Sequence, residues 1–158
     1  MSERPPVIAL VDDEPMVITS LRAYLALETE YEVLTYGDPT EAIADLPNQT
    51  LDLVISDYLM PQMNGIDFLL EVKKIHPFAT RILLTGYADK ENAIKAINEV
   101  GLYQYVEKPW SNDDLRITIQ NGLERRFLLE RLEDKIQEVQ NVQQSLQDIQ
   151  AQIIKAFM

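Results

Sequence analysis

The sequence has no cysteine and few basic side chains, and these absences exclude several classes of protein. Its 158 residues contain 14 Lys and Arg against 26 Asp and Glu, a formal net charge of −12. A chain without cysteine has no disulfide framework and no thiolate metal site. Because nucleic-acid phosphates are bound by clustered Lys and Arg, we expect no direct contact with nucleic acid.

Long apolar runs are also missing. The longest uninterrupted apolar run is about five residues, whereas a membrane-spanning helix needs roughly 20. The first residues, Met-Ser-Glu-Arg-Pro-Pro, lack the apolar core of a signal peptide. We therefore expect a cytoplasmic protein with no membrane partner. The apolar fraction of 46% is nevertheless typical of a globular protein with a buried core.

Short apolar segments alternate with helical patterns over the first 110 residues. The segments predicted as strands are 7–11, 32–36, 53–56, 81–85 and 102–106. Helical patterns lie between them near 14–29, 39–46, 65–75 and 89–100. Parallel neighbouring strands require helical crossovers, so this order predicts an α/β fold with a five-stranded, parallel, doubly wound sheet.

The last 48 residues follow a different pattern. No proline occurs after Pro109, and Ser111 is placed to cap a helix that continues to the end. Apolar residues then recur every seven positions, at Leu132, Val139, Leu146 and Ile153. Leu128, Val142, Ile149 and Ala156 fill the companion positions, and Lys135 interrupts them. A heptad seam of this kind predicts a parallel dimeric coiled coil rather than a helix folded back on its own domain. The seam meets no helix-stop signal, so we expect an output domain to follow.

Charged side chains stand at the ends of three predicted strands. Asp12 and Asp13 follow the first strand, Asp57 follows the third, and Lys108 follows the fifth. In a doubly wound sheet the carboxyl ends of the strands face one crevice, where ligands bind. We therefore expect these side chains to converge, with the Thr85 hydroxyl at the end of the fourth strand on the same rim.

This combination predicts a metal-assisted phosphoryl site. Crowded carboxylates need a cation, and an all-oxygen ligand set favours Mg²⁺, or Mn²⁺ as the alternative. A metal beside Asp57, with Lys108 opposite, would create an electron-poor pocket in which the carboxylate attacks phosphorus. One such residue alone would be an ordinary turn or strand residue, but four motifs in order at strand ends are a specific signal.

The motifs resemble the receiver domain of bacterial two-component response regulators over residues 6–122. They are Val11-Asp12-Asp13-Glu14-Pro15, Ser56-Asp57-Tyr58-Leu59-Met60-Pro61-Gln62-Met63-Asn64-Gly65, Leu84-Thr85-Gly86-Tyr87 and Glu107-Lys108-Pro109-Trp110. The resemblance implies a flavodoxin-like, CheY-like fold in a phosphorelay protein that is regulatory and not an enzyme. It also implies a cis peptide bond before Pro109.

The resemblance further implies a role for individual positions. Asp57 would be the phosphoacceptor, with a sensor histidine kinase as the phosphodonor. Asp12, Asp13, Asp57 and the backbone carbonyl of Leu59 would bind Mg²⁺. Lys108 would bind the phosphoryl group, and Thr85 and Tyr105 would be the switch residues. We thus expect a receiver domain at residues 1–122 and a coiled-coil dimerisation linker at 123–158, through which the signal reaches an output.

Two other functions share some of these features. A haloacid-dehalogenase-like phosphatase also uses a strand-end Asp and Mg²⁺, but it needs a second Asp two residues later, where Leu59 stands. A dimerisation scaffold that is never phosphorylated would have no need of Asp57, Thr85 and Lys108 together. The receiver motifs resemble those joined to signalling enzymes or to transcription activators, and the helical linker favours an enzyme as the output.

Overall fold

The computed structural model describes residues 4–157, apart from the side chains of Tyr87 and Ala96. The chain divides into two compact units, residues 1–126 and 127–158. The first unit contains the sheet and the helices that cover it, and the second is helical from residue 127 to Ala156.

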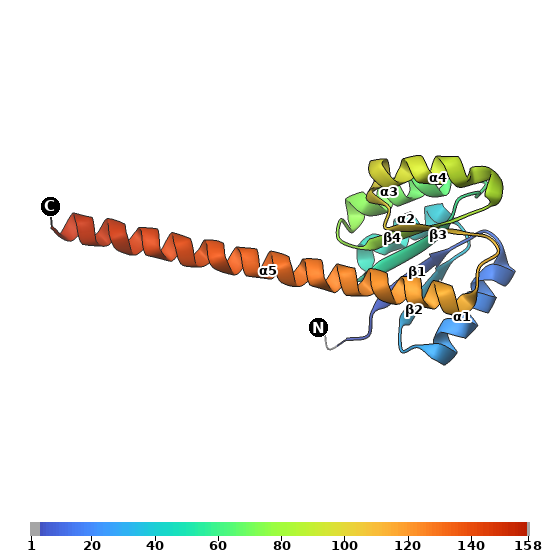
Figure 1. Ribbon diagram of the computed structural model, residues 1–158, viewed down its shortest axis with the longest axis horizontal. Helices are drawn as coiled ribbons and strands as arrows, with labels where there is room; N and C mark the ends of the chain where they lie inside the picture. The colour runs from blue at the N-terminus through green and yellow to red at the C-terminus, as the bar shows by residue number, and fades with distance from the viewer. Residues whose placement is uncertain (1–3, 158) are drawn as a thin grey trace. The chain divides into compact units, whose positions relative to one another are not determined.

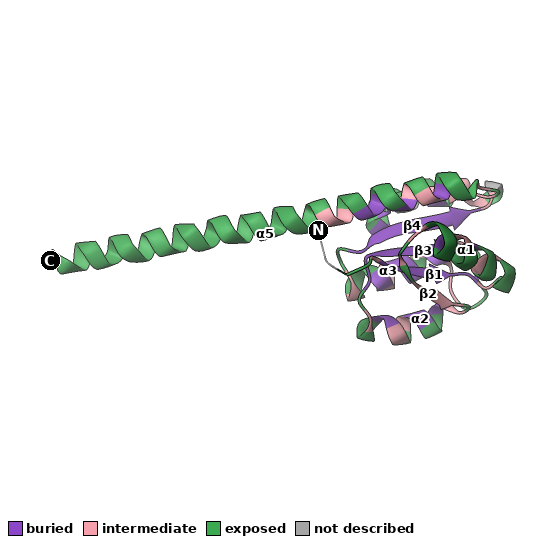
Figure 2. Cartoon of the chain, turned by 90° about the horizontal axis from the view of Figure 1, so that it is seen from below, coloured by how far each residue is buried: buried purple, intermediate pink, exposed green. Residues whose placement is uncertain are grey.

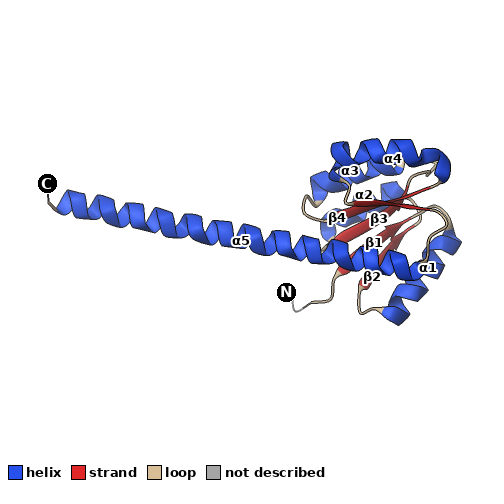
Figure 3. Ribbon diagram, viewed as in Figure 1, coloured by secondary structure: helices blue, strands red, loops and turns tan. Residues whose placement is uncertain are grey.

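The first unit is built on a five-stranded parallel sheet (Figure 3). Its strands are β1 (Val7–Val11), β2 (Glu32–Tyr36), β3 (Leu53–Asp57), β4 (Thr80–Thr85) and β5 (Gln104–Glu107). Their spatial order is β2-β1-β3-β4-β5, and every neighbouring pair is parallel. The predicted doubly wound sheet is confirmed. The strand order reverses beside β1 and β3, so a ligand crevice is expected at their carboxyl ends.

Helices cover both faces of the sheet (Figure 1). They are α1 (Pro15–Glu28), α2 (Pro39–Asp45), α3 (Gly65–Ile75), α4 (Lys90–Ala96) and α5 (Asn112–Ala156). One core cluster joins one sheet face to α2, α3 and α4 through Ala42, Phe68, Leu69, Val72 and Ala93. The first turns of α5 bury Leu115, Ile119 and Leu123. The central strands β1, β3 and β4 are therefore buried along their whole length (Figure 2).

A glycine allows α5 to approach the sheet closely. The Thr80 hydroxyl donates a hydrogen bond to the Gly122 carbonyl, at 2.9 Å. A Cβ at Gly122 would lie 3.0 Å from Thr80 Cγ2 and 3.1 Å from Leu53 Cδ1, closer than nearly all real side chains sit. The missing side chain thus sets the distance between this helix and strands β3 and β4.

Several element boundaries differ from the sequence prediction. The last strand begins at Gln104 rather than at residue 102. Helix α4 ends at Ala96 and passes into a π-helical turn, Ile97–Gly101. Gly101 has a φ of +68°, a conformation that suits glycine and ends the helix. The helix predicted to end at residue 46 ends at Asp45 and is followed by a 3₁₀ turn, Leu46–Asn48.

Helix α5 continues without interruption to Ala156. The four residues of the predicted seam, Leu132, Val139, Leu146 and Ile153, are each more than half exposed. Figure 2 shows the exposed class continuing along the helix beyond the first unit. Among the described residues, no helix is long and apolar enough to span a membrane.

Candidate functional site at the carboxyl edge of the sheet

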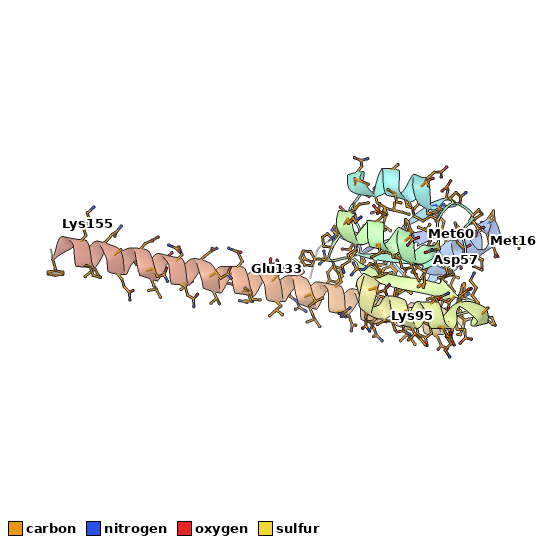
Figure 4. All side chains as sticks on the ribbon, turned by 90° about the horizontal axis from the view of Figure 1, so that it is seen from above. Met16, Asp57, Met60, Lys95, Glu133 and Lys155 are labelled. Carbon is orange, nitrogen blue, oxygen red and sulfur yellow. The ribbon has the colours of Figure 1, made fainter. Side chains whose placement is uncertain are left out.

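Three carboxylates meet at the carboxyl ends of β1 and β3. These strands are neighbours with Val11 opposite Ser56, so Asp12 and Asp13 after β1 stand beside Asp57 at the end of β3. One carboxylate oxygen from each of the three lies within 4.8 Å of the others. Figure 4 labels Asp57 beside Met60 in the globular unit. The predicted convergence of these side chains is therefore present, although Asp57 is the last residue of its strand rather than the one after it.

Lys108 reaches the same cluster from the end of β5. Its Nζ lies 2.9 Å from Asp57 Oδ1, and the two side chains are 28% and 6% exposed. The Tyr58 backbone N–H donates to the same oxygen at 3.0 Å. The Lys108 backbone N–H donates to the Thr85 carbonyl at 2.8 Å, which fixes the start of the loop. The peptide bond between Lys108 and Pro109 is cis, as the resemblance implies.

Asp13, Asp57 and Lys108 line an open cleft of about 330 Å³. Its lining residues are Asp13, Glu14, Asp57, Leu59, Gly86, Asp89 and Lys108. Glu14 and Asp89 were not predicted as site residues. Glu14 could have been found as the third acid of the run that begins at Asp12, whereas Asp89 belongs to the turn Tyr87–Asp89 and has no linear pattern.

Burial raises the pKa of two carboxyl groups of the site, Asp12 and Asp57. The pKa of Asp12 rises to about 6, mainly because the carboxyl group is buried and also because of the Asp57 charge, against the hydrogen bond from the Glu14 N–H. Burial likewise raises the pKa of Asp57, and the Lys108 ammonium only partly opposes it. Burial by itself would lower the pKa of Lys108, but pairing with Asp57 outweighs it and raises that pKa.

These shifts show a site with too little positive charge. One ammonium group faces three carboxylates, and Asp12 Oδ2 is buried with no hydrogen-bond partner among residues 4–157. A divalent cation with oxygen ligands would supply the missing charge and a partner for that oxygen. The residues present therefore fit a hard metal ion.

Thr85 and Tyr105 lie on adjacent strands beside the cleft. Thr85 is fully buried at the end of β4, and its hydroxyl has no hydrogen-bond partner in the described part of the chain. Tyr105 stands opposite Leu83 in the β4–β5 register and is half-buried against the core. Side chains two residues apart on a strand share a face, so Tyr105 is on the same face of the sheet as Thr85.

A flavodoxin-like sheet with clustered carboxylates and a lysine at its carboxyl edge defines a class of α/β proteins that bind ligands at the strand ends. The family model of the response regulator receiver domain matches residues 8–120. The chain therefore belongs to the response regulator receiver domain family. The proteins of this family are regulatory, and the family fits phosphorelay signalling. The predicted class of function, a regulatory receiver domain, is therefore confirmed.

Relatives and solved structures agree with this assignment. The hydrogenase transcriptional regulatory protein HoxA of Cupriavidus necator is 38% identical over 128 residues, which is 81% of this chain and 26% of that protein. A response regulator receiver domain protein from Clostridium thermocellum has a TM-score of 0.74 at 37% identity, covering 78% of this chain and 98% of that chain. The receiver domain of an HD domain-containing protein from Pseudomonas fluorescens Pf-5 has a TM-score of 0.76 at 34% identity, covering 83% and 96%. The chain spans about a quarter of the length of the curated relatives it matches.

Proposed function

We propose that this chain receives a phosphoryl group on Asp57 from a sensor histidine kinase, in a Mg²⁺-dependent reaction in the cytoplasm. The observation that carries the proposal is the Asp57 carboxylate, which is paired with Lys108 at 2.9 Å and lies within 4.8 Å of two further carboxylates. An Asp57 oxygen would form the new bond to phosphorus as the bond to the kinase histidine nitrogen breaks.

The other cleft residues have distinct roles in this proposal. Asp12, Asp13, Asp57 and the Leu59 carbonyl would hold the Mg²⁺ ion, which neutralises charge on the transferring oxygens; Mn²⁺ fits the same ligands. The Lys108 ammonium would move from the carboxylate to a phosphoryl oxygen, where it stabilises the negative charge.

Phosphotransfer to the Asp57→Asn variant tests the proposal. We expect labelling from a kinase or a small-molecule phosphodonor to fall to background, because the amide is not a nucleophile. Asp67→Asn is the matched control, since Asp67 is an exposed residue in the first turn of α3, and it should label like the unmodified chain. Full labelling of Asp57→Asn would remove Asp57 from its role.

We further propose that phosphorylation is sensed by Thr85 and Tyr105. The Thr85 hydroxyl would donate to a phosphoryl oxygen, and its movement would leave room for Tyr105 to turn inward. The two residues face the same side of the sheet on adjacent strands, which supports this coupling. A ligand shifts such an equilibrium only by its different affinity for the two states, so both must exist beforehand.

The output is proposed to pass along α5, with residues 1–122 as the receiver and 123–158 as a parallel homodimeric coiled coil. Leu132, Val139, Leu146 and Ile153 form an exposed stripe with a seven-residue period, the pattern that a second copy of the helix covers. In a parallel pair of helices, Arg131 of one copy lies opposite Ile136 of the other, and Glu138 lies opposite Gln143. Neither of these pairs beside the seam brings two like charges together. The greater length of the relatives supports an output domain beyond the coiled coil.

Solution mass tests the dimer through two adjacent substitutions. Leu146→Lys places a charge in the proposed seam, whereas Gln147→Lys adds the same charge beside it. We expect the first to weaken association by about 100-fold and the second to leave it nearly unchanged, because only the seam position loses water on pairing. A monomer mass for the unmodified chain, with and without the phosphoryl mimic beryllofluoride, would contradict the dimer, as would a trimer or tetramer.

A further inference from the structure

The apolar seam of α5 follows two heptad registers that meet at Val139. Up to that residue, one series of exposed apolar side chains is Leu129, Leu132, Ile136 and Val139, spaced by three, four and three residues, with the exposed Leu128 outside the series. From Val139 onward, a second series is Val139, Val142, Leu146, Ile149 and Ile153, spaced by three, four, three and four, with the exposed Ile154 and Phe157 outside it. Val139 is a d position in the first series and an a position in the second. The register changes there because Ile136, Val139 and Val142 are separated by two successive steps of three residues, whereas a regular heptad alternates steps of three and four.

Neither register places apolar residues at all the a and d positions of both halves of the segment. If the second register extends backwards, the seam includes Lys135 at a d position. In a parallel homodimer that lysine faces its own copy, so two ammonium groups would be brought together away from water. If the first register extends forwards, Gln143 and Gln150 occupy a positions in place of Val142 and Ile149.

The second register would remove the exposed ion pair that Lys135 now forms. Its ammonium group lies 3.4 Å from the Glu138 carboxylate, in an ion pair whose side chains are 76% and 66% exposed. In the first register Lys135 is a g position at the edge of the seam, where its aliphatic stem covers apolar surface and its charge stays in water. Ile136, half exposed in the chain, then enters the seam instead.

We propose that residues 127–139 exchange between these two registers in the dimer, and that phosphorylation of the receiver shifts the balance. This inference rests on the proposed dimerisation of α5. Register 1 buries Leu129, Leu132 and Ile136; register 2 buries Leu128, Leu132 and Lys135. Changing Leu132 from d to a rotates each helix by roughly 50° about its axis, since a and d are three residues apart at 3.5 residues per turn. The element with two states is thus the helix pair, which rotates between the two registers. Because α5 is one continuous helix, it connects this segment directly to the receiver.

Adjacent leucines provide a direct readout of the register. The chain has no cysteine, so single Leu128→Cys and Leu129→Cys variants of the whole chain each introduce one thiol. Leu128 is a d position in register 2 and Leu129 is an a position in register 1; each lies outside the seam in the other register. We expect both variants to form disulfide-linked dimers, and Mg²⁺ with beryllofluoride to change their yields in opposite directions by at least about twofold, the shift of a bistable equilibrium by a ligand.

Two further backgrounds fix the registers independently of the receiver. Lys135→Leu makes register 2 fully apolar and should suppress cross-linking of Leu129→Cys. Gln143→Leu with Gln150→Leu makes register 1 fully apolar and should suppress cross-linking of Leu128→Cys. Yields that are the same in all three backgrounds would overturn the two registers, and a ratio unaffected by beryllofluoride would overturn the regulatory role.

Failure of the dimer itself has a separate signature. Val142 lies in the seam of the second half in either state, so a Val142→Cys variant reports association without reporting the register. Absence of that cross-link together with a monomer mass would overturn dimerisation and this inference with it. An efficient cross-link at Val142 with only one reactive leucine position would overturn the two registers while leaving the proposed dimer intact.

Discussion

Replacing Asp12 by asparagine should stabilise the metal-free protein at neutral pH and abolish its stabilisation by Mg²⁺. The pKa of Asp12 rises from 3.8 to about 6 on folding because the carboxyl group is buried. At neutral pH the ionised group then costs up to ~3 kcal/mol of folding free energy. Asparagine has nearly the same shape and no charge, and it can still accept the hydrogen bond from the Glu14 N–H.

The pH dependence follows from the same shift. Since the folded state binds the Asp12 proton more tightly than the unfolded chain does, its contribution to stability is complete below about pH 4 and is lost as the pH rises through about 6. The metal-free chain should therefore lose stability over this window, and Asp12→Asn should lose less. Added Mg²⁺ should reverse the order at neutral pH, because only the unmodified chain retains all its carboxylate ligands.

Urea unfolding in chelator and in millimolar Mg²⁺ measures both effects. Asp134→Asn, a change at an exposed carboxylate on α5, is the control and should behave like the unmodified chain in both conditions. An Asp12→Asn variant that is less stable in chelator, or equally stabilised by Mg²⁺, would contradict the electrostatic account of the cleft.

Replacing Gly65 by alanine should destabilise the receiver by about 3 kcal/mol and weaken Mg²⁺ binding as well. Gly65 is the first residue of α3, and a Cβ there would lie 2.2 Å from the Asp57 carbonyl oxygen and 2.8 Å from Leu83 Cδ1. The Gly65 N–H also donates to the Tyr58 carbonyl at 2.8 Å. Any movement that makes room for the new Cβ must displace the segment that places Leu59 in the cleft lining.

A second glycine provides the comparison. Among the described residues, no atom beyond those of Gly37 and its two chain neighbours lies within 4 Å of where its Cβ would be, so Gly37→Ala should change the free energy of unfolding by no more than about 0.5 kcal/mol. Urea unfolding of the two variants, with Mg²⁺ titration of each, measures the difference. Equal stability of the two would show that α3 can move away from β3 at little cost.

The fold and the convergence of the main candidate site residues could be predicted because the strands that position them have local sequence signals. The strands are short apolar runs, buried on both faces in the case of 7–11 and 53–57. Once a parallel sheet is predicted, its topology alone brings Asp12, Asp57 and Lys108 to one edge, and the distances in the structure agree with that expectation.

The features that escaped prediction leave no mark in the local pattern of apolar residues. The start of β5 is set by pairing with β4, where Gln104 stands opposite Ile82, and no residue near position 102 marks it. The π-helical turn Ile97–Gly101 needs an extra residue in the helical ladder, which apolar periodicity does not reveal. Asp89 enters the cleft lining through a short turn with no strand-end signature.

The hydroxyl of Thr85, which has no hydrogen-bond partner among residues 4–157, has a consequence for how such a domain evolves. A buried donor without a partner destabilises the resting form by ~1–3 kcal/mol, and under the proposed role of Thr85 a phosphoryl oxygen would relieve that penalty. The same missing hydrogen bond then increases the response to the signal and lowers the folding stability of the unstimulated protein. A neighbouring substitution that gave the hydroxyl a permanent acceptor would make the protein sturdier and less responsive at once.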